Sequence, residues 1–177
     1  MSSLTDGTTL SSGLLIARLV FGLLVVGHGT QKLFGWFGGY GLAGTGGFFE
    51  GLGFRPGRAF AAAASLTEIA GGLLLALDFL GPVGPALIIS VMLVAAISVH
   101  WQNGLFAASN GIELPLLYAA GAISLALTGP GLFSLDAALG LTSLWTPGIA
   151  WAAIAIGVVG GLVNLGLRRT GTQQVAA

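Results

Sequence analysis

Five long hydrophobic stretches constrain the fold of this chain more than any other feature of its sequence. They run from about Gly13 to Phe34, Ala59 to Leu80, Pro82 to Trp101, Gly111 to Thr128, and Pro147 to Leu167. An α-helix needs about 20 apolar residues to cross the ~30 Å hydrocarbon core of a bilayer. The first, second and fifth stretches clearly reach this length, and the fourth is the shortest. The sequence therefore predicts transmembrane helices.

The composition is that of a membrane bundle rather than a soluble globule. Charged residues make up 7% of the 177 residues and hydrophobic residues 55%, whereas a soluble domain has about 25% charged residues. The 31 glycines fit this class, because small residues let helix backbones approach closely in lipid. We predict an all-α fold, a polytopic bundle of transmembrane helices in contact with the lipid bilayer.

The glycine, proline and polar residues between the stretches predict how the chain is organised. We expect a polar N-terminal tail (1–12), a four-helix membrane domain (13–140), an additional transmembrane helix (147–168) and a polar C-terminal tail (169–177). The segment from Gly35 to Gly57 is rich in glycine and aromatic residues. This pattern favours an interfacial loop over a re-entrant segment. The segment from Phe133 to Thr146 reads as a second surface segment, consistent with a short interfacial helix.

Charge predicts the orientation and excludes some partners. With the N-terminus outside and five crossings, the cytoplasmic side receives most of the basic residues: Lys32, Arg55, Arg58, Arg168 and Arg169. This arrangement satisfies the positive-inside rule with one exception, Arg18, which lies within the first stretch. The net charge is zero without a run of like charges, so nucleic acid is not an expected partner. The chain has no cysteine, which excludes thiol and cysteine-ligated iron–sulfur chemistry within it.

Ionisable and amide side chains inside the hydrophobic stretches mark the candidate functional positions, because such side chains are costly in lipid. The candidates for a polar pocket are His28, Gln31, Lys32, Glu68, His100 and Glu113. Since successive helices alternate in direction, we expect these residues to converge near the cytoplasmic face, with Glu68 deepest. Arg18 and Asp136 are candidates for a structural ion pair at the outer end of the bundle.

Each of these residues also has a purely structural explanation. Glu68 could bond neighbouring helices as a protonated carboxyl group, the histidines could be satisfied by local hydrogen bonds, and Lys32 could extend to the headgroups. A shared pocket could instead bind a quinone headgroup, relay protons or hold a small polar substrate. The spacing of histidines and acids does not favour a metal site, so we predict no metal.

Five segments in order resemble the DoxX family of small bacterial membrane proteins, which includes DoxD-like relatives. They are ARLVFGLLVVGHGTQKLFG (17–35), LTEIAGGLLLAL (66–77), VMLVAAISVHWQNGLF (91–106), NGIELPLL (110–117) and LTGPGLFSLD (127–136). The resemblance extends from Leu14 to Leu139. It implies a four-helix core, with the fifth helix outside the family pattern, in the bacterial cytoplasmic (inner) membrane.

The resemblance also implies a class of function. DoxD-like relatives are linked to thiosulfate:quinone oxidoreductase, and some DoxX proteins to membrane redox complexes in oxidative-stress defence and thiol balance. The chain is thus expected to be at most the membrane subunit of an oxidoreductase; no cofactor is fixed, a quinone is the candidate, and redox proteins or a second copy of the chain are candidate partners. The alternatives are a small-molecule or proton transporter or channel, and a membrane scaffold without chemistry.

Overall fold

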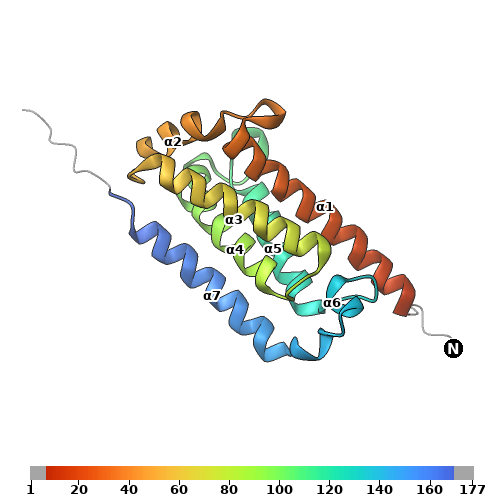
Figure 1. Cartoon of the computed structure of the whole chain (residues 1–177). Coiled ribbons are helices and arrows are strands. Elements are labelled where there is room, and N and C mark those ends of the chain that lie inside the picture. Colours follow the sequence, from red (N-terminus) through yellow and green to blue (C-terminus); the bar gives the residue numbers. More distant parts are fainter. Residues whose placement is uncertain (1–6, 170–177) are drawn as a thin grey trace, which may run out of the picture.

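The computed structural model describes residues 7–169 as a bundle of roughly parallel and antiparallel helices (Figure 1). Its long members are α1 (Gly7–Phe34), α3 (Gly57–Leu77), α4 (Val83–Ala95), α5 (Glu113–Thr128) and α7 (Pro147–Gly166). α4 continues through a π-helical turn (Ala96–His100) and a 3-10 turn to Asn103. No strand occurs within the described range. The predicted all-α bundle is confirmed.

Four segments of the described chain are long and apolar enough to cross a bilayer. They are α1, α3, the continuous segment Val83–Asn103, and α7. α5 has 16 residues, which corresponds to about 24 Å of helix at ~1.5 Å per residue. The predicted fourth helix is thus present, and it is shorter than a typical span.

The helices pack in the order α1, α3, α4 and α7, with α5 against α4 and α1. α7 lies on the side of the bundle away from α1 (Figure 1). Glycine makes the closest contact: a Cβ atom at Gly22 would lie 2.5 Å from the carbonyl oxygen of Gly72, and the converse distance is also 2.5 Å. The backbones of α1 and α3 therefore touch in a way that only glycine permits.

The apolar core draws on all five long helices. Its buried members are Val25, Leu75, Ile88, Ile89, Met92, Ala122, Ala126 and Ile154. Large apolar side chains such as Leu23, Leu116 and Ile156 are exposed on the outside of the bundle. An exterior that is as apolar as the interior is what a lipid environment requires, because lipid tails do not penalise exposed apolar surface.

α1 begins at Gly7, six residues before the predicted start at Gly13. Two serines near the start of α1 have hydrogen-bond partners, one within the helix and one in the segment after α5. Ser12 Oγ donates to the carbonyl oxygen of Thr8 at 2.9 Å, and Ser11 Oγ accepts from the backbone N–H of Leu132 at 3.0 Å. The remainder of the predicted N-terminal tail (1–6) and most of the C-terminal tail (170–177) lie outside the described residues.

The expected loop between the first two long helices is itself helical. After a 3-10 turn (Trp36–Gly38), α2 (Gly41–Gly51) packs across the start of α3 (Figure 1). Its Gly46 lies so close to α3 that a Cβ atom there would be 2.8 Å from Cγ of Arg58. Trp36, Phe37 and Tyr40 remain largely exposed, and their placement among headgroups stays a prediction. The second surface segment contains the short helix α6 (Leu135–Ala138).

Candidate functional site

Two ion pairs occur among the residues that the structure describes, one toward each end of the bundle. Lys32 on α1 binds Glu68 on α3, with Nζ at 2.7 Å from Oε1 and 2.6 Å from Oε2. Arg18 on α1 binds Asp78, which follows α3, with Nη1 at 2.9 Å from Oδ2. We call the first region the α2 end and the second the α6 end. The first pair connects α1 to α3, and the second connects α1 to the residue directly after α3.

The Lys32–Glu68 pair lies inside the protein. The side chain of Glu68 is 4% exposed and that of Lys32 is 28% exposed. Nζ of Lys32 also approaches the carbonyl oxygen of His28 at 3.5 Å. A lone carboxylate at this depth would be costly, and the ammonium group offsets that cost by contacting both of its oxygens. Lys32 therefore turns toward α3 rather than out toward the headgroups.

A cavity of about 590 Å³, which we call the α2-end pocket, opens beside this pair. α2 covers it with Thr45, Phe48 and Phe49, while α3 and α4 form its walls. Small side chains create the room, and they include Ala63, Ala64 and Ala95. The polar lining residues are Lys32, Tyr40, Thr45, Thr67, Glu68, Ser90, Ser98, His100 and Asn164. The pocket is thus mainly apolar, with a charged pair in its wall.

His100 is held at the edge of this pocket by the loop that follows α4. Its Nδ1 lies 2.8 Å from the carbonyl oxygen of Asn110. A carbonyl oxygen can only accept, so Nδ1 carries the proton and a neutral ring presents Nε2 as an acceptor. The amide of Asn103 donates to the same carbonyl oxygen at 3.2 Å. The tautomer of His100 is therefore fixed by its backbone partner.

The six residues predicted to share one pocket do not share it. Lys32, Glu68 and His100 line the α2-end pocket. His28 and Gln31 line a separate cavity of about 430 Å³ together with Trp36 and Phe37. His28 stands edge-on to Tyr118 of α5, with ring centroids 5.7 Å apart. α1 contacts both α3 and α5, and His28 lies against α5.

Glu113, the sixth of these residues, supports a loop. Its Oε2 accepts a hydrogen bond from the backbone N–H of Ala107 at 2.6 Å. The backbone N–H of Glu113 donates to the carbonyl oxygen of Leu105 at 2.8 Å. These bonds close the segment between α4 and α5, and this segment in turn positions the carbonyl oxygen that holds His100. Glu113 thus acts on the pocket only through the loop.

Several polar lining residues were not singled out in the sequence. Asn164 is an amide within the apolar fifth stretch, and the cost argument applied to the other stretches would have selected it. Tyr40 and Thr45 fall in the segment predicted as a loop, where the sequence does not indicate a helical face. Ser98 and Thr67 carry hydroxyl groups that α-helices accommodate without a tertiary partner, and their sequence signal is weak.

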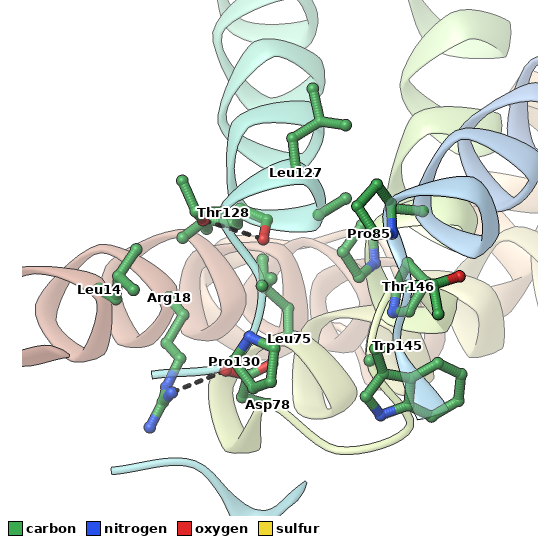
Figure 2. A pocket seen from close by; sticks show the side chains of 17 residues that line it. Leu14, Arg18, Leu75, Asp78, Pro85, Leu127, Thr128, Pro130, Trp145 and Thr146 are labelled. Atoms are coloured by element: carbon green, nitrogen blue, oxygen red, sulfur yellow. Dashed lines mark hydrogen bonds and ion pairs between the residues drawn. The ribbon is translucent and has the colours of Figure 1, made fainter. Parts of the chain in front are cut away.

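The predicted Arg18–Asp136 pair is replaced by Arg18–Asp78 (Figure 2). Asp136 is fully buried and accepts from the backbone N–H groups of Leu80 at 3.1 Å and Gly81 at 2.7 Å. Its carboxylate is therefore occupied by the turn after α3, where Asp78, Leu80 and Gly81 all have positive φ. Burial raises the pKa of Asp78 above its ordinary value, against the opposing effect of the Arg18 guanidinium.

The arrangement of α1, α3 and α4 corresponds to the part of the sequence that a known family describes. A family model described as DoxX matches residues 13–101, just over half of the chain. The match includes Arg18, Lys32, Glu68 and His100 and ends before the region of α5 to α7. No curated protein and no solved structure matches the chain. With four spans long enough to cross a bilayer, this multi-pass membrane protein belongs to the DoxX family.

Proposed function

We propose that the α2-end pocket binds a lipophilic molecule of the quinone class, and that the chain is the membrane subunit of a redox assembly in the bacterial cytoplasmic membrane. The observation that carries this proposal is the buried Lys32–Glu68 pair in the wall of a mainly apolar cavity. A quinone combines an apolar ring with carbonyl oxygens, and this pocket combines an apolar surface with a few polar groups.

The dimensions support a ligand of this kind. The volume of about 590 Å³ lies within the range of roughly 300–1,000 Å³ that is usual for small-molecule pockets. The lining residues Phe48, Phe49 and Val94 offer apolar contacts to a substituted ring. A polar substrate without an apolar body would leave most of this surface without a partner.

The polar groups are suited to two carbonyl oxygens and to protons. The ammonium group of Lys32 has three N–H bonds, and two short contacts go to Glu68. One N–H is left to donate to a ligand oxygen, since its other contact, to His28, is long at 3.5 Å. At the edge of the pocket, Nε2 of His100 can accept a proton from a ligand hydroxyl group.

A bound quinone would supply a redox couple of two electrons and two protons. In this chain, Lys32 and Glu68 would orient the ligand and hold protons on one side, and His100 would do so on the other. The chain lacks cysteine, so a thiol relay would require a redox protein as partner. A chain that binds the quinone and leaves the thiol relay to a partner is a membrane subunit rather than a complete enzyme.

The charges at the two ends support a cytoplasmic location for this pocket. The C-terminal end of α7 meets the α2 end: Nε of Arg168 donates to the carbonyl oxygen of Leu52 at 3.0 Å, and the N–H of Arg169 donates to that of Gly53 at 2.8 Å. Basic residues therefore gather at the α2 end, whereas Asp78 and Asp136 lie at the α6 end. The positive-inside rule favours an orientation with the α2 end inside.

Extraction and binding experiments test the proposal together. The protein is purified in mild detergent, extracted with organic solvent and analysed for quinones by mass spectrometry, and binding of a decyl-substituted benzoquinone is measured by calorimetry. Ala64→Phe fills the pocket, and Ala70→Phe is the matched control because Ala70 is exposed on the same helix and does not line the pocket. We expect binding to fall at least tenfold in Ala64→Phe alone. Absence of quinone from the extract, together with equal binding by both variants, would refute the proposal.

A further inference from the structure

The basic side chains of this chain are divided between two internal ion pairs and one corner of the surface. The chain has six lysine and arginine residues in all. Arg18 and Lys32 bind Asp78 and Glu68. The other four lie at the α2 end, in or beside the loop of residues 52–56 that joins α2 to α3. These four residues, which we call the arginine corner, are Arg55, Arg58, Arg168 and Arg169.

Tertiary contacts hold the end of α7 against this loop (Figure 1). Nε of Arg168 donates to the carbonyl oxygen of Leu52, and the backbone N–H of Arg169 donates to that of Gly53. Gly53 has a φ of 95°, and a Cβ atom there would lie 3.0 Å from the carbonyl oxygen of Arg169, so a larger residue is disfavoured. The guanidinium carbon of Arg168 lies 5.6 Å from the ring centroid of buried Phe54, a cation–π distance.

The other two arginines stand on the opposite side of the same contact. Arg58 lies in the first turn of α3, where its Cγ atom packs against Gly46 of α2. Arg55 lies in the loop, and both residues are exposed. Glu50 is the acidic residue nearest to them in the sequence, but its Oε1 accepts from the backbone N–H of Gly57 at 3.1 Å. Within residues 7–169, no carboxylate forms an ion pair with any member of the arginine corner.

The arginine corner therefore carries positive charge that the described part of the protein does not compensate. Like charges gathered around one loop repel one another, and a bound anion would offset this repulsion. Nη1 and Nη2 of Arg168 accept no bond and have no acceptor among residues 7–169, while Nε fixes the group in place. A guanidinium group presents paired N–H donors that match the oxygens of a phosphate group. The charge and the donors thus favour a phosphate ligand.

The position of the arginine corner at the end of a membrane span favours a phosphate that belongs to a lipid. α7 is long and apolar enough to cross a bilayer and ends at Gly166, so Arg168 and Arg169 follow it directly. The last turns of α7 carry exposed apolar side chains, among them Val163 and Leu167. A phospholipid combines a phosphate at this depth with acyl chains that contact such a surface, whereas a soluble anion offers only the charge.

We propose that the arginine corner binds the headgroup of an anionic phospholipid, whose acyl chains lie along the exposed apolar side chains of α7. The phosphate receives hydrogen bonds from guanidinium groups of the α2–α3 loop, α3 and α7. A zwitterionic lipid such as phosphatidylcholine binds less well, because its ammonium group meets the same four cations. The bound lipid links α7 to the start of α3. This site is separate from the α2-end pocket, and its existence does not depend on quinone binding there.

Competition between two lipids tests the proposal. The full chain is purified and delipidated in mild detergent, and equal amounts of dioleoyl phosphatidylglycerol and dioleoyl phosphatidylcholine are added. Native mass spectrometry then measures how much of each lipid is bound. Because the acyl chains are identical, any difference reports the headgroup. We expect phosphatidylglycerol to bind about tenfold more tightly.

Variants locate the binding site. Arg55→Gln/Arg58→Gln removes two exposed charges whose side chains form no ion pair within residues 7–169, and phosphatidylglycerol should then bind about tenfold less tightly, at the level of phosphatidylcholine. The matched control adds Gln102→Arg and Ala108→Arg, at exposed positions of another loop at the α2 end. It restores the charge of this end but not of the arginine corner, so binding should stay weak. The melting temperature reports whether each variant is folded.

The side chain of Arg169 tests the contribution of α7. Arg169→Gln keeps the backbone hydrogen bond to Gly53 and removes one charge. We expect phosphatidylglycerol to bind about threefold less tightly, with phosphatidylcholine unchanged. Unchanged binding of phosphatidylglycerol would show that α7 does not share the site.

Three further results would overturn the proposal. The first is equal binding of the two lipids by the unaltered chain, a comparison that requires no variant to fold. The second is recovery of phosphatidylglycerol binding in the control with relocated charges, since the total charge of this end would then suffice. The third is displacement of the lipid by an equal concentration of inorganic phosphate, which would make the ligand a soluble anion. None of these results bears on quinone binding at the α2-end pocket.

Discussion

Removing one partner of the Lys32–Glu68 pair should be costly, and the cost should depend on which partner is removed. Breaking a buried ion pair destabilises a protein by about 3–5 kcal/mol, because a charge is left without compensation. Glu68 is 4% exposed and Lys32 is 28% exposed. Lys32→Met leaves the more buried carboxylate of Glu68 without its partner, so we expect the free energy of unfolding to fall by about 3–5 kcal/mol. Glu68→Gln leaves an amide carbonyl oxygen near Nζ of Lys32, and the ammonium group keeps access to solvent. We therefore expect the free energy of unfolding to fall by only about 1–3 kcal/mol.

The double variant Lys32→Met/Glu68→Gln should be less destabilised than Lys32→Met alone, since no charge is then buried. The assay is unfolding in a fixed ratio of mild to denaturing detergent, followed by circular dichroism, with the coupling energy taken from the double-mutant cycle. Equal effects of the two single changes, or effects that simply add in the double variant, would show that the two side chains do not form the buried pair that the structure describes.

Two further changes test the packing of the bundle. Gly22→Ala should loosen the contact of α1 with Gly72 and lower the melting temperature. Gly27→Ala is the control, because no atom lies within 4 Å of the added Cβ; it should leave the melting temperature unchanged or raise it, since alanine is favoured in helices by ~1 kcal/mol over glycine. Equal melting temperatures of the two variants would contradict this prediction. Asp136→Ala should lower the free energy of unfolding by roughly 2–4 kcal/mol, since it leaves two backbone N–H groups of the turn after α3 without their acceptor. Limited proteolysis near Gly81 would detect the loosened turn. Unchanged stability and unchanged cleavage would contradict this prediction.

The sequence predicts the long helices well because their lengths are set by the bilayer. It does not predict α2, because the glycine-rich run GTGGFF has low helix propensity. The helix forms where Gly46 can pack directly on α3 at Arg58. Tertiary contact outweighs local preference here, and no pattern within the segment reveals it.

The candidate site could be predicted only in part, for a geometric reason. Depth in the membrane can be read from position along each stretch, and it predicts Lys32 and His100 near one face with Glu68 deeper; these three residues line the α2-end pocket. The neighbours of each helix cannot be read in the same way. α1 contacts both α3 and α5, and His28, one turn from Lys32, stands against Tyr118 of α5 rather than against α3.

The sequence does not show that Asp78 rather than Asp136 binds Arg18, for the same geometric reason. Both lie at the same end of the bundle, so depth does not distinguish them as partners of Arg18. The turn after α3 decides the matter, because its backbone N–H groups at Leu80 and Gly81 take the carboxylate of Asp136. Backbone hydrogen bonds of this kind appear only once the turn is formed.

The π-helical turn at the end of α4 has a consequence for insertions and deletions. A π-helical turn accommodates one more residue than an α-helical turn, and each α-helical residue advances the side-chain direction by about 100°. Every side chain beyond Ala96–His100 is therefore rotated relative to an uninterrupted helix. Deleting a single residue within the turn would let the segment close into a regular α-helix with the following side chains in nearly the same direction, whereas deleting one from Val83–Ala95 would turn His100 by about 100° away from the pocket. The chemistry of this pocket thus depends on a residue count as much as on residue identity.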